Sequence, residues 1–323
     1  MTLPPFPIAG GISVALARGF WVAGLFSVFG ATLARQVTMR PALVGVGPAG
    51  VIALGRWRTL IGASLALAVL ASATWTWLIA GTLAGAPGFA SIAATAWILL
   101  GATSYGHIVL LQWTALALVV ASLVRRLYWM AAGFAAIALA LEATHGHAFA
   151  QDPGASWLLF AVMLHLLAGA AWLGGLLPLL ISIQSLPVRQ AALACHRFSP
   201  LGIVCVPVVA ATAGFQFWML IGALPLLLDT AYGLMALAKT VLFLILLGFG
   251  ATNLLRLTPA LAGGAPLHAR QRMRRSLANE TMIGLLVVLA AGVLASLPPS
   301  VEVAAMGAHP MAGMGGAHAH IQQ

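Results

Sequence analysis

Charged residues are scarce in this sequence. They make up 6% of the 323 residues, whereas a soluble domain carries about 25%. Acidic residues are scarcer than basic ones, with 5 Asp and Glu against 15 Lys and Arg. Hydrophobic residues make up 62% of the chain. This balance excludes a soluble domain. It predicts an all-α polytopic membrane protein whose main partner is the lipid bilayer.

Sequence motifs of common enzymes and redox proteins are also missing. The two cysteines, Cys195 and Cys205, form neither a CxxC nor a CxxCH motif. Their placement argues against a disulfide scaffold, a thiol redox centre and covalently attached c-type haem. The sequence contains no Walker motif, no nucleophile elbow and no pair of carboxylates within one apolar segment. We therefore expect a protein that is not an enzyme.

Eight apolar segments are long enough to cross a membrane. They cover residues 10–34, 58–84, 105–124, 128–144, 156–182, 200–222, 232–254 and 278–297, the fourth being near the short limit. A shorter apolar run near 88–101 is expected to form an interfacial or re-entrant helix. Because the N-terminus lacks the basic region of a signal peptide, we expect the first segment to be a retained helix.

The basic residues predict the orientation of these eight segments. They follow the first, third, fifth and seventh segments, while the opposite side carries only acidic residues. The basic set comprises Arg35, Arg40, Arg56, Arg58, Arg125, Arg126, Arg189, Arg197, Arg256, Arg270, Arg272, Arg274 and Arg275, and the acidic set comprises Glu142, Asp152, Asp229 and Glu302. The positive-inside rule then places both termini outside, which is the periplasm if the source is Gram-negative. This topology accounts for the net charge of +10, so no nucleic-acid partner is expected.

A short motif occurs twice and predicts two parallel four-helix repeats. The sequence TSYG at 103–106 opens the third segment, and TAYG at 230–233 opens the seventh, at an offset of 127 residues. The same offset pairs Gln112 with Lys239. We expect a first half over 1–150, which includes the short helix, a second half over 151–300, and a flexible periplasmic tail rich in Met and His over 301–323.

One histidine, His165, is expected deep in the membrane. It lies about nine residues into the fifth segment, which places the imidazole about 13 Å into the hydrocarbon. A polar group there is costly without partners, so His165 is our central candidate for a metal ligand. Met163 is two residues away and points in another direction, so it is a weaker candidate. The small residues at 169–171 are expected to let a neighbouring helix approach closely.

Further imidazole and thioether groups are expected on the outer side, most of them in the tail. Residues 306–320 contain three Met and three His, and no carboxylate follows Glu302. Thioethers select Cu(I), and imidazoles accept Cu(I) or Cu(II), so the tail is predicted to collect copper ions. The candidate copper ligands are His165, His145, His147, His107, Met163, Met306, His309, Met311, Met314, His318 and His320.

Three polar features leave alternatives open. Arg18 and Lys239 are not metal ligands when charged. Each could extend toward the headgroups, pair with Glu142 or Asp229, or hold a site together through hydrogen bonds. The Cys195–His196 pair is either a cytoplasmic acceptor for Cu(I) or two ordinary small residues of a helix.

Several stretches resemble the CopD family of copper-resistance and copper-uptake membrane proteins. They are HLLAGAAWLGGL at 165–176, RFSP at 197–200, TAG at 212–214, and the segment from Tyr232 through Lys239 to Asn253, within residues 145–260. The resemblance implies an inner-membrane protein that handles periplasmic copper, often beside a small periplasmic copper-binding partner. This chain departs from the family in having few acidic residues and its own Met/His tail.

Three functions remain open from the sequence. The first is a copper homeostasis protein that binds periplasmic copper and delivers or translocates it across the inner membrane. The second is a b-type haem electron-transfer protein, which needs two histidines facing each other at matched depth. The third is a membrane subunit that binds copper without transporting it.

Overall fold

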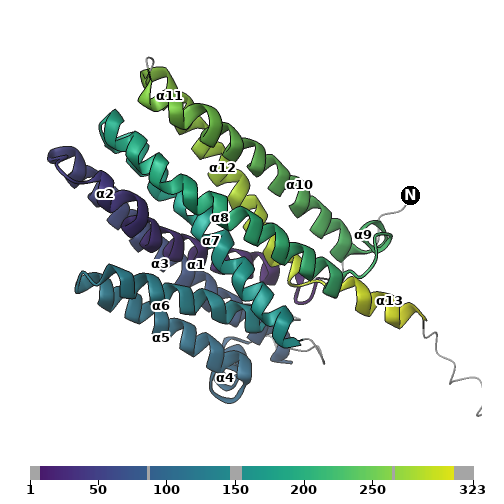
Figure 1. Cartoon of the computed structure of the whole chain (residues 1–323). Helices are drawn as coiled ribbons and strands as arrows, with labels where there is room; N and C mark the ends of the chain where they lie inside the picture. The colour runs from purple at the N-terminus through teal and green to yellow at the C-terminus, as the bar shows by residue number, and fades with distance from the viewer. Residues whose placement is uncertain (1–7, 86–87, 146–154, 264–265, 309–323) are drawn as a thin grey trace, which may run out of the picture.

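The structure is a computed structural model, and it describes residues 8–85, 88–145, 155–263 and 266–308 (Figure 1). Every regular element in these ranges is a helix. The α-helices are α1 (Gly11–Ala34), α2 (Arg40–Ala42), α3 (Pro48–Leu83), α4 (Phe89–Ala102), α5 (Ser104–Val124), α6 (Tyr128–Ala140), α7 (Ala155–Ser185), α8 (Val188–Leu220), α9 (Leu226–Asp229), α10 (Ala231–Thr252), α11 (Thr258–Ala262), α12 (Pro266–Leu294) and α13 (Ser300–Ala308). Two π-helical turns occupy Arg35–Met39 and Asn253–Leu257, and a 3₁₀ helix occupies Leu141–His145.

Seven helical segments in the described ranges are long and apolar enough to cross a membrane. They contain α1, α3, α5, α7, α8, α10 and α12, and so correspond to seven of the eight predicted segments. The predicted segment 128–144 is different, because α6 has only 13 residues and continues as the 3₁₀ helix. The change of helix type comes next to Glu142, whose carboxylate turns inward to Arg18. The short apolar run predicted near 88–101 is confirmed as the helix α4.

Three long helices begin earlier than the apolar segments predict. Helices α3, α8 and α12 start at Pro48, Val188 and Pro266, ahead of the predicted starts at 58, 200 and 278. Arginine is a good helix former, so the basic stretches extend the helices rather than form loops. Figure 1 shows α2 and α11 at one end of the bundle and α4, α9 and α13 at the other. We call the end with α2 and α11 the basic end.

The two copies of the repeated motif form the same helix cap. The hydroxyl of Thr103 accepts a hydrogen bond from the backbone N–H of Gly106 and donates to the carbonyl of Leu99. Thr230 makes the equivalent bonds with Gly233 and Leu226. A side chain at either glycine would overlap the backbone of the preceding helix. A Thr N-cap followed by a glycine that permits close approach therefore starts both α5 and α10.

Helices α1 and α7 cross at the centre of the bundle through small residues. Both Gly30 and Gly174 have so little space that an added Cβ would overlap the opposite backbone. Ala170 is fully buried at the same crossing, as predicted for the small residues at 169–171. Helix α1 also packs against α3 and α12, and α7 also packs against α8 and α12. Close approach of small residues is the usual way in which membrane helices associate.

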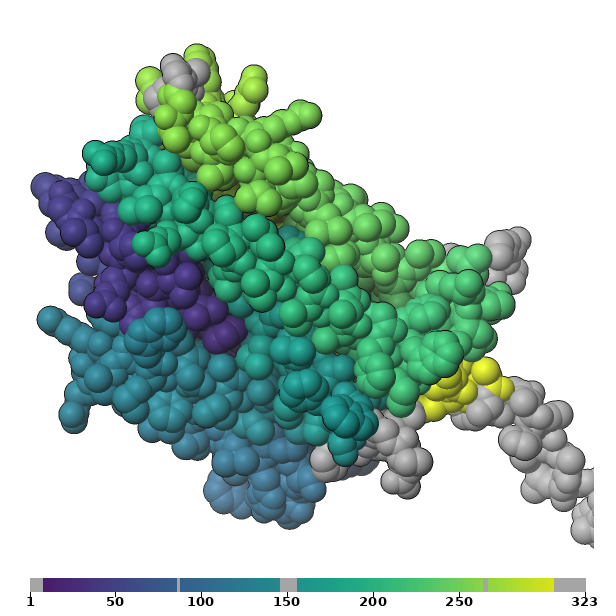
Figure 2. All heavy atoms as spheres, viewed as in Figure 1, coloured from purple at the N-terminus to yellow at the C-terminus, as the bar shows by residue number. Residues whose placement is uncertain are grey.

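Helix α10 lies at the edge of the bundle, where much of its surface is exposed in the space-filling view of Figure 2. Only 6% of the most apolar window of its span is buried. Its outer face is apolar and includes Leu237, Val241 and Leu244. Between α10 and its neighbours α8 and α12 lie two cavities, which are described below.

The tail begins as a helix. Residues Ser300–Ala308 form α13, which corrects the prediction that the chain is unstructured from residue 301. The start of α13 is held to the start of α10, because the hydroxyls of Thr230 and Ser300 lie 2.6 Å apart. Residues 309–323 lie outside the described residues.

We expect Gly174→Ala to destabilise the protein by about 1–3 kcal/mol, the usual cost of overpacking. The new methyl group would meet the carbonyl of Phe26, which cannot move without displacing α1. The matched control is Gly248→Ala on α10, where an added Cβ meets no atom within 4 Å. Alanine favours a helix by up to about 1 kcal/mol over glycine, so the control should be neutral or stabilising. The measurement is the thermal unfolding midpoint in detergent, and equal midpoints for the two variants would contradict this packing.

Candidate functional site

A cavity of about 180 Å³ lies among α1, α7, α8, α10 and α12, in the half of the bundle away from the basic end. We call it the His165 cavity. Its polar lining consists of His165 from α7, Gln216 from α8, Tyr232 and Lys239 from α10, and the pair of Arg18 and Glu142. The remaining walls are mostly aliphatic and aromatic. A small set of polar groups in an apolar cavity is typical of a binding site.

The imidazole of His165 is oriented by Thr212. Its Nδ1 lies 3.0 Å from the hydroxyl oxygen of Thr212, and that hydroxyl lies 2.6 Å from the carbonyl oxygen of Val208. A hydroxyl has one proton, and the short bond to Val208 uses it. The Thr212 oxygen therefore accepts a hydrogen bond from Nδ1–H, which leaves the lone pair of Nε2 available. This is the arrangement in which a metal-binding histidine is held by a second partner.

Arg18 and Glu142 form a buried ion pair at the edge of this cavity. The Nε atom of Arg18 lies 3.1 Å from the carboxylate of Glu142, and the two side chains are 9% and 4% exposed. The indole of Trp21 donates to the same carboxylate at 2.9 Å. Arg18 also donates to the carbonyl of Ala295 and lies over the ring of Trp75. Of the alternatives for Arg18, the structure selects pairing with Glu142.

Lys239 lines the cavity without an ion pair. Among the described residues the one ion pair is that of Arg18 and Glu142, so Lys239 is not bound to Asp229. An intramembrane lysine that faces a cavity is a functional-site candidate by default.

His145 is placed next to the His165 cavity but does not line it. Its Nε2 lies 3.2 Å from the side-chain oxygen of Gln112, and its ring packs against Trp75 and Tyr105. These contacts hold the imidazole of His145 against residues of the first half of the sequence.

The other predicted ligands are dispersed. Met163 is partly buried and lines neither of the two cavities. His107 is exposed, with its Nε2 3.1 Å from the carbonyl of Gly101. Met306 lies in α13. The candidates outside the described residues are His147, His309, Met311, Met314, His318 and His320. Within the described ranges, no three His, Cys, Asp or Glu side chains converge on a point that could hold a metal ion.

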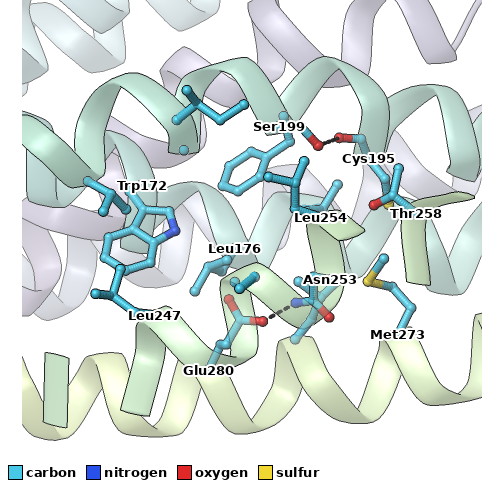
Figure 3. A pocket seen from close by; sticks show the side chains of 18 of the residues that line it. Trp172, Leu176, Cys195, Ser199, Leu247, Asn253, Leu254, Thr258, Met273 and Glu280 are labelled. Atoms are coloured by element: carbon cyan, nitrogen blue, oxygen red, sulfur yellow. Dashed lines mark hydrogen bonds between the residues drawn. The ribbon is translucent and has the colours of Figure 1, made fainter. Parts of the chain in front are cut away.

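A second cavity, of about 270 Å³, lies among α7, α8, α10 and α12 on the side toward the basic end (Figure 3). We call it the Glu280 cavity. Trp172 lines both cavities. Glu280 and Met273, which are not among the candidates predicted from the sequence, line this cavity together with Asn253 and Cys195. The signal in the sequence that could have indicated this site is Glu280 itself, a single carboxylate near the start of the apolar segment 278–297.

His196, by contrast, is exposed, although its neighbour Cys195 is buried. Successive residues of a helix point about 100° apart, which separates these two side chains. Of the two alternatives for Cys195 and His196, the structure therefore favours ordinary residues of a helix.

Comparison with known proteins identifies two matching family models. The model described as "Copper resistance protein D-like, N-terminal domain" matches residues 10–157, and the model described as "Copper resistance protein D" matches residues 192–294. A curated relative, the copper transport protein CutJ of Bacillus subtilis (strain 168), is 30% identical over 185 residues, which are 55% of this chain and 32% of CutJ. The chain thus spans about a third of the length of that relative. No solved structure matches.

Proposed function

Because the chain belongs to the copper resistance protein D family, we propose that it binds copper at the His165 cavity and carries it across the membrane. The observation on which this rests is the hydrogen bond between Thr212 and Nδ1 of His165 at the cavity wall, which leaves Nε2 as the nitrogen that can bind a metal. An imidazole nitrogen is a ligand for Cu(I) and Cu(II). The role is non-enzymatic, with copper as the cargo.

The tail supplies the remaining ligands in this proposal. One imidazole does not hold copper alone, and the described residues offer no cluster of three donors at His165. The tail leaves the bundle beside the cavity, since Ser300 is bonded to Thr230 and the nearby Tyr232 lines the cavity wall. Its thioethers and imidazoles suit copper collected outside the cell. A small periplasmic copper-binding protein is the expected partner for loading.

We propose eight crossings, with both termini on the periplasmic side of the inner membrane. Residues 128–145 comprise α6 and the 3₁₀ helix, which together rise about 30 Å, the thickness of the hydrocarbon. His145 at the end of this segment packs against Tyr105 near the start of α5. The end of the segment and the start of α5 therefore lie at the same depth in the membrane. The basic end then faces the cytoplasm, as the positive-inside rule requires. The matched caps of α5 and α10 support two parallel repeats.

Copper uptake into sealed proteoliposomes tests this function. Vesicles containing the protein and loaded with a Cu(I) chelator should accumulate many copper ions per chain, while vesicles without protein should not. A chain that lacks residues 309–323 keeps α13 whole and should take up copper more slowly at low copper concentration. Binding of a few ions per chain without accumulation would contradict transport, and would instead identify a copper-binding subunit.

A further inference from the structure

The Glu280 cavity contains a carboxylate that has no cationic partner. The side chain of Glu280 is 1% exposed and lies within α12. Its hydrogen-bond donors are neutral, namely the amide of Asn253 and the hydroxyl of Ser276. Among the described residues the single ion pair is the distant one of Arg18 and Glu142. An unpaired buried charge in a membrane is costly, so Glu280 is a functional-site candidate, and a cation nearby would stabilise its charged form.

Asn253 supplies an independent sign of a missing ligand. The residue is 9% exposed, and its Oδ1 atom is buried without a hydrogen-bond partner. It stands at the start of the π-helical turn Asn253–Leu257, and turns of this kind are frequent at functional sites. Figure 3 shows its amide directed toward Glu280 within the cavity. A cation in the cavity would satisfy both the Oδ1 atom and the carboxylate.

Two sulfur atoms complete the set of donors. Cys195 from α8 and Met273 from α12 are 3% and 1% exposed, and both line the cavity. Figure 3 shows the thioether of Met273 on the same side of the cavity as Asn253 and Cys195. The Cys195 thiol is free of any disulfide. Four possible donors, from α8, α12 and the π-helical turn, therefore line one cavity.

We infer that the Glu280 cavity is a second metal site, which takes Cu(I). Thioether and thiol sulfur favour this soft ion, whereas Ca²⁺ and Mg²⁺ require more oxygen ligands than the cavity offers. Cysteine binds a metal as the thiolate, so the Cys195 thiol releases a proton on binding, and Glu280 is the carboxylate in the cavity that can take it. With Glu280 protonated, the negative charge of the thiolate balances the single positive charge of the ion, so the filled cavity is neutral. No change of oxidation state is required. The choice of metal rests on the proposed copper function. Because the Glu280 cavity lies toward the basic end, copper that enters from the periplasm would reach it after the His165 cavity.

The test counts Cu(I) ions held per full-length chain in detergent against a competing Cu(I) chelator. The double variant Cys195→Ser/Met273→Leu should hold one ion fewer than the unmodified protein. Donors in the tail contribute equally to both counts and so cancel. The matched control is Cys205→Ser, since Cys205 is also a buried free thiol on α8 but does not line the cavity. Its count should equal that of the unmodified protein.

A single variant tests the carboxylate. Glu280→Gln keeps the size of the side chain and should weaken the affinity of this ion by about 10–100-fold, the range found when supporting groups of metal sites are removed. Gel filtration verifies that each variant is folded, and Cys195→Ala replaces Cys195→Ser in the double variant if that chain misfolds. An unchanged count in the double variant, or unchanged affinity in Glu280→Gln, would overturn the inference. Failed copper uptake with the ion count as predicted would instead overturn the proposed transport function alone.

Discussion

Replacement of His165 by alanine should lower copper uptake into proteoliposomes at least 10-fold, while the protein still inserts and folds. The variant removes the one imidazole that lines the cavity among the described residues. Folding should persist because the Thr212 hydroxyl keeps its hydrogen bond to the carbonyl of Val208. The control is His268→Ala, which removes an exposed histidine near the start of α12. Uptake that survives His165→Ala at the unmodified rate would contradict the proposed site.

A second variant tests whether Thr212 orients the imidazole. Thr212→Val removes the hydroxyl that accepts from Nδ1–H but keeps the shape of the side chain. Loss of such an orienting partner reduces metal affinity by about 10–100-fold. Copper affinity measured by competition should therefore fall in Thr212→Val, although no ligand has been removed. If affinity stays the same while His165→Ala reduces it, His165 binds copper without the orientation proposed here.

Breaking the pair of Arg18 and Glu142 should cost about 3–5 kcal/mol of stability, because each single variant leaves a buried charge unpaired. Both side chains are under 10% exposed, so solvent does little to compensate for the loss. The expected result for Arg18→Met is a lower thermal midpoint in detergent and a smaller yield of folded protein. In Arg18→Met the carboxylate keeps the indole of Trp21 as a donor but loses its charged partner.

The double variant Arg18→Met/Glu142→Leu provides the matched control for this prediction. Replacing a buried ion pair by apolar residues of similar volume is often neutral or stabilising. The double variant should therefore recover most of the midpoint lost in Arg18→Met. A double variant no more stable than the single one would show that the pair is not the source of the loss. Copper uptake by the double variant would then measure how much this ion pair contributes to transport through the His165 cavity.

Some site features were visible in the sequence, and others required helix packing. His165 was predicted from its depth in an apolar segment, and the structure places it in a cavity. The pairing of Arg18 with Glu142 was one of several open alternatives, because these residues lie 124 positions apart. His145 was predicted as a copper ligand on the outer side, and its ring packs against Trp75 and Tyr105. The 3₁₀ helix Leu141–His145, which sets the direction of this ring, cannot be predicted from composition.

By itself the sequence determined that the chain is helical, which stretches can enter a membrane and at which end the arginines gather. These properties are local, since the cost of placing each residue in hydrocarbon hardly depends on its distant neighbours. The tertiary structure alone decided which polar side chains share a cavity. Glu280 meets Asn253, and Cys195 and Met273 line the same cavity, only because α8, α10 and α12 pack together through complementary side-chain shapes. Such packing joins residues far apart in the chain, and a single sequence carries no direct record of those contacts.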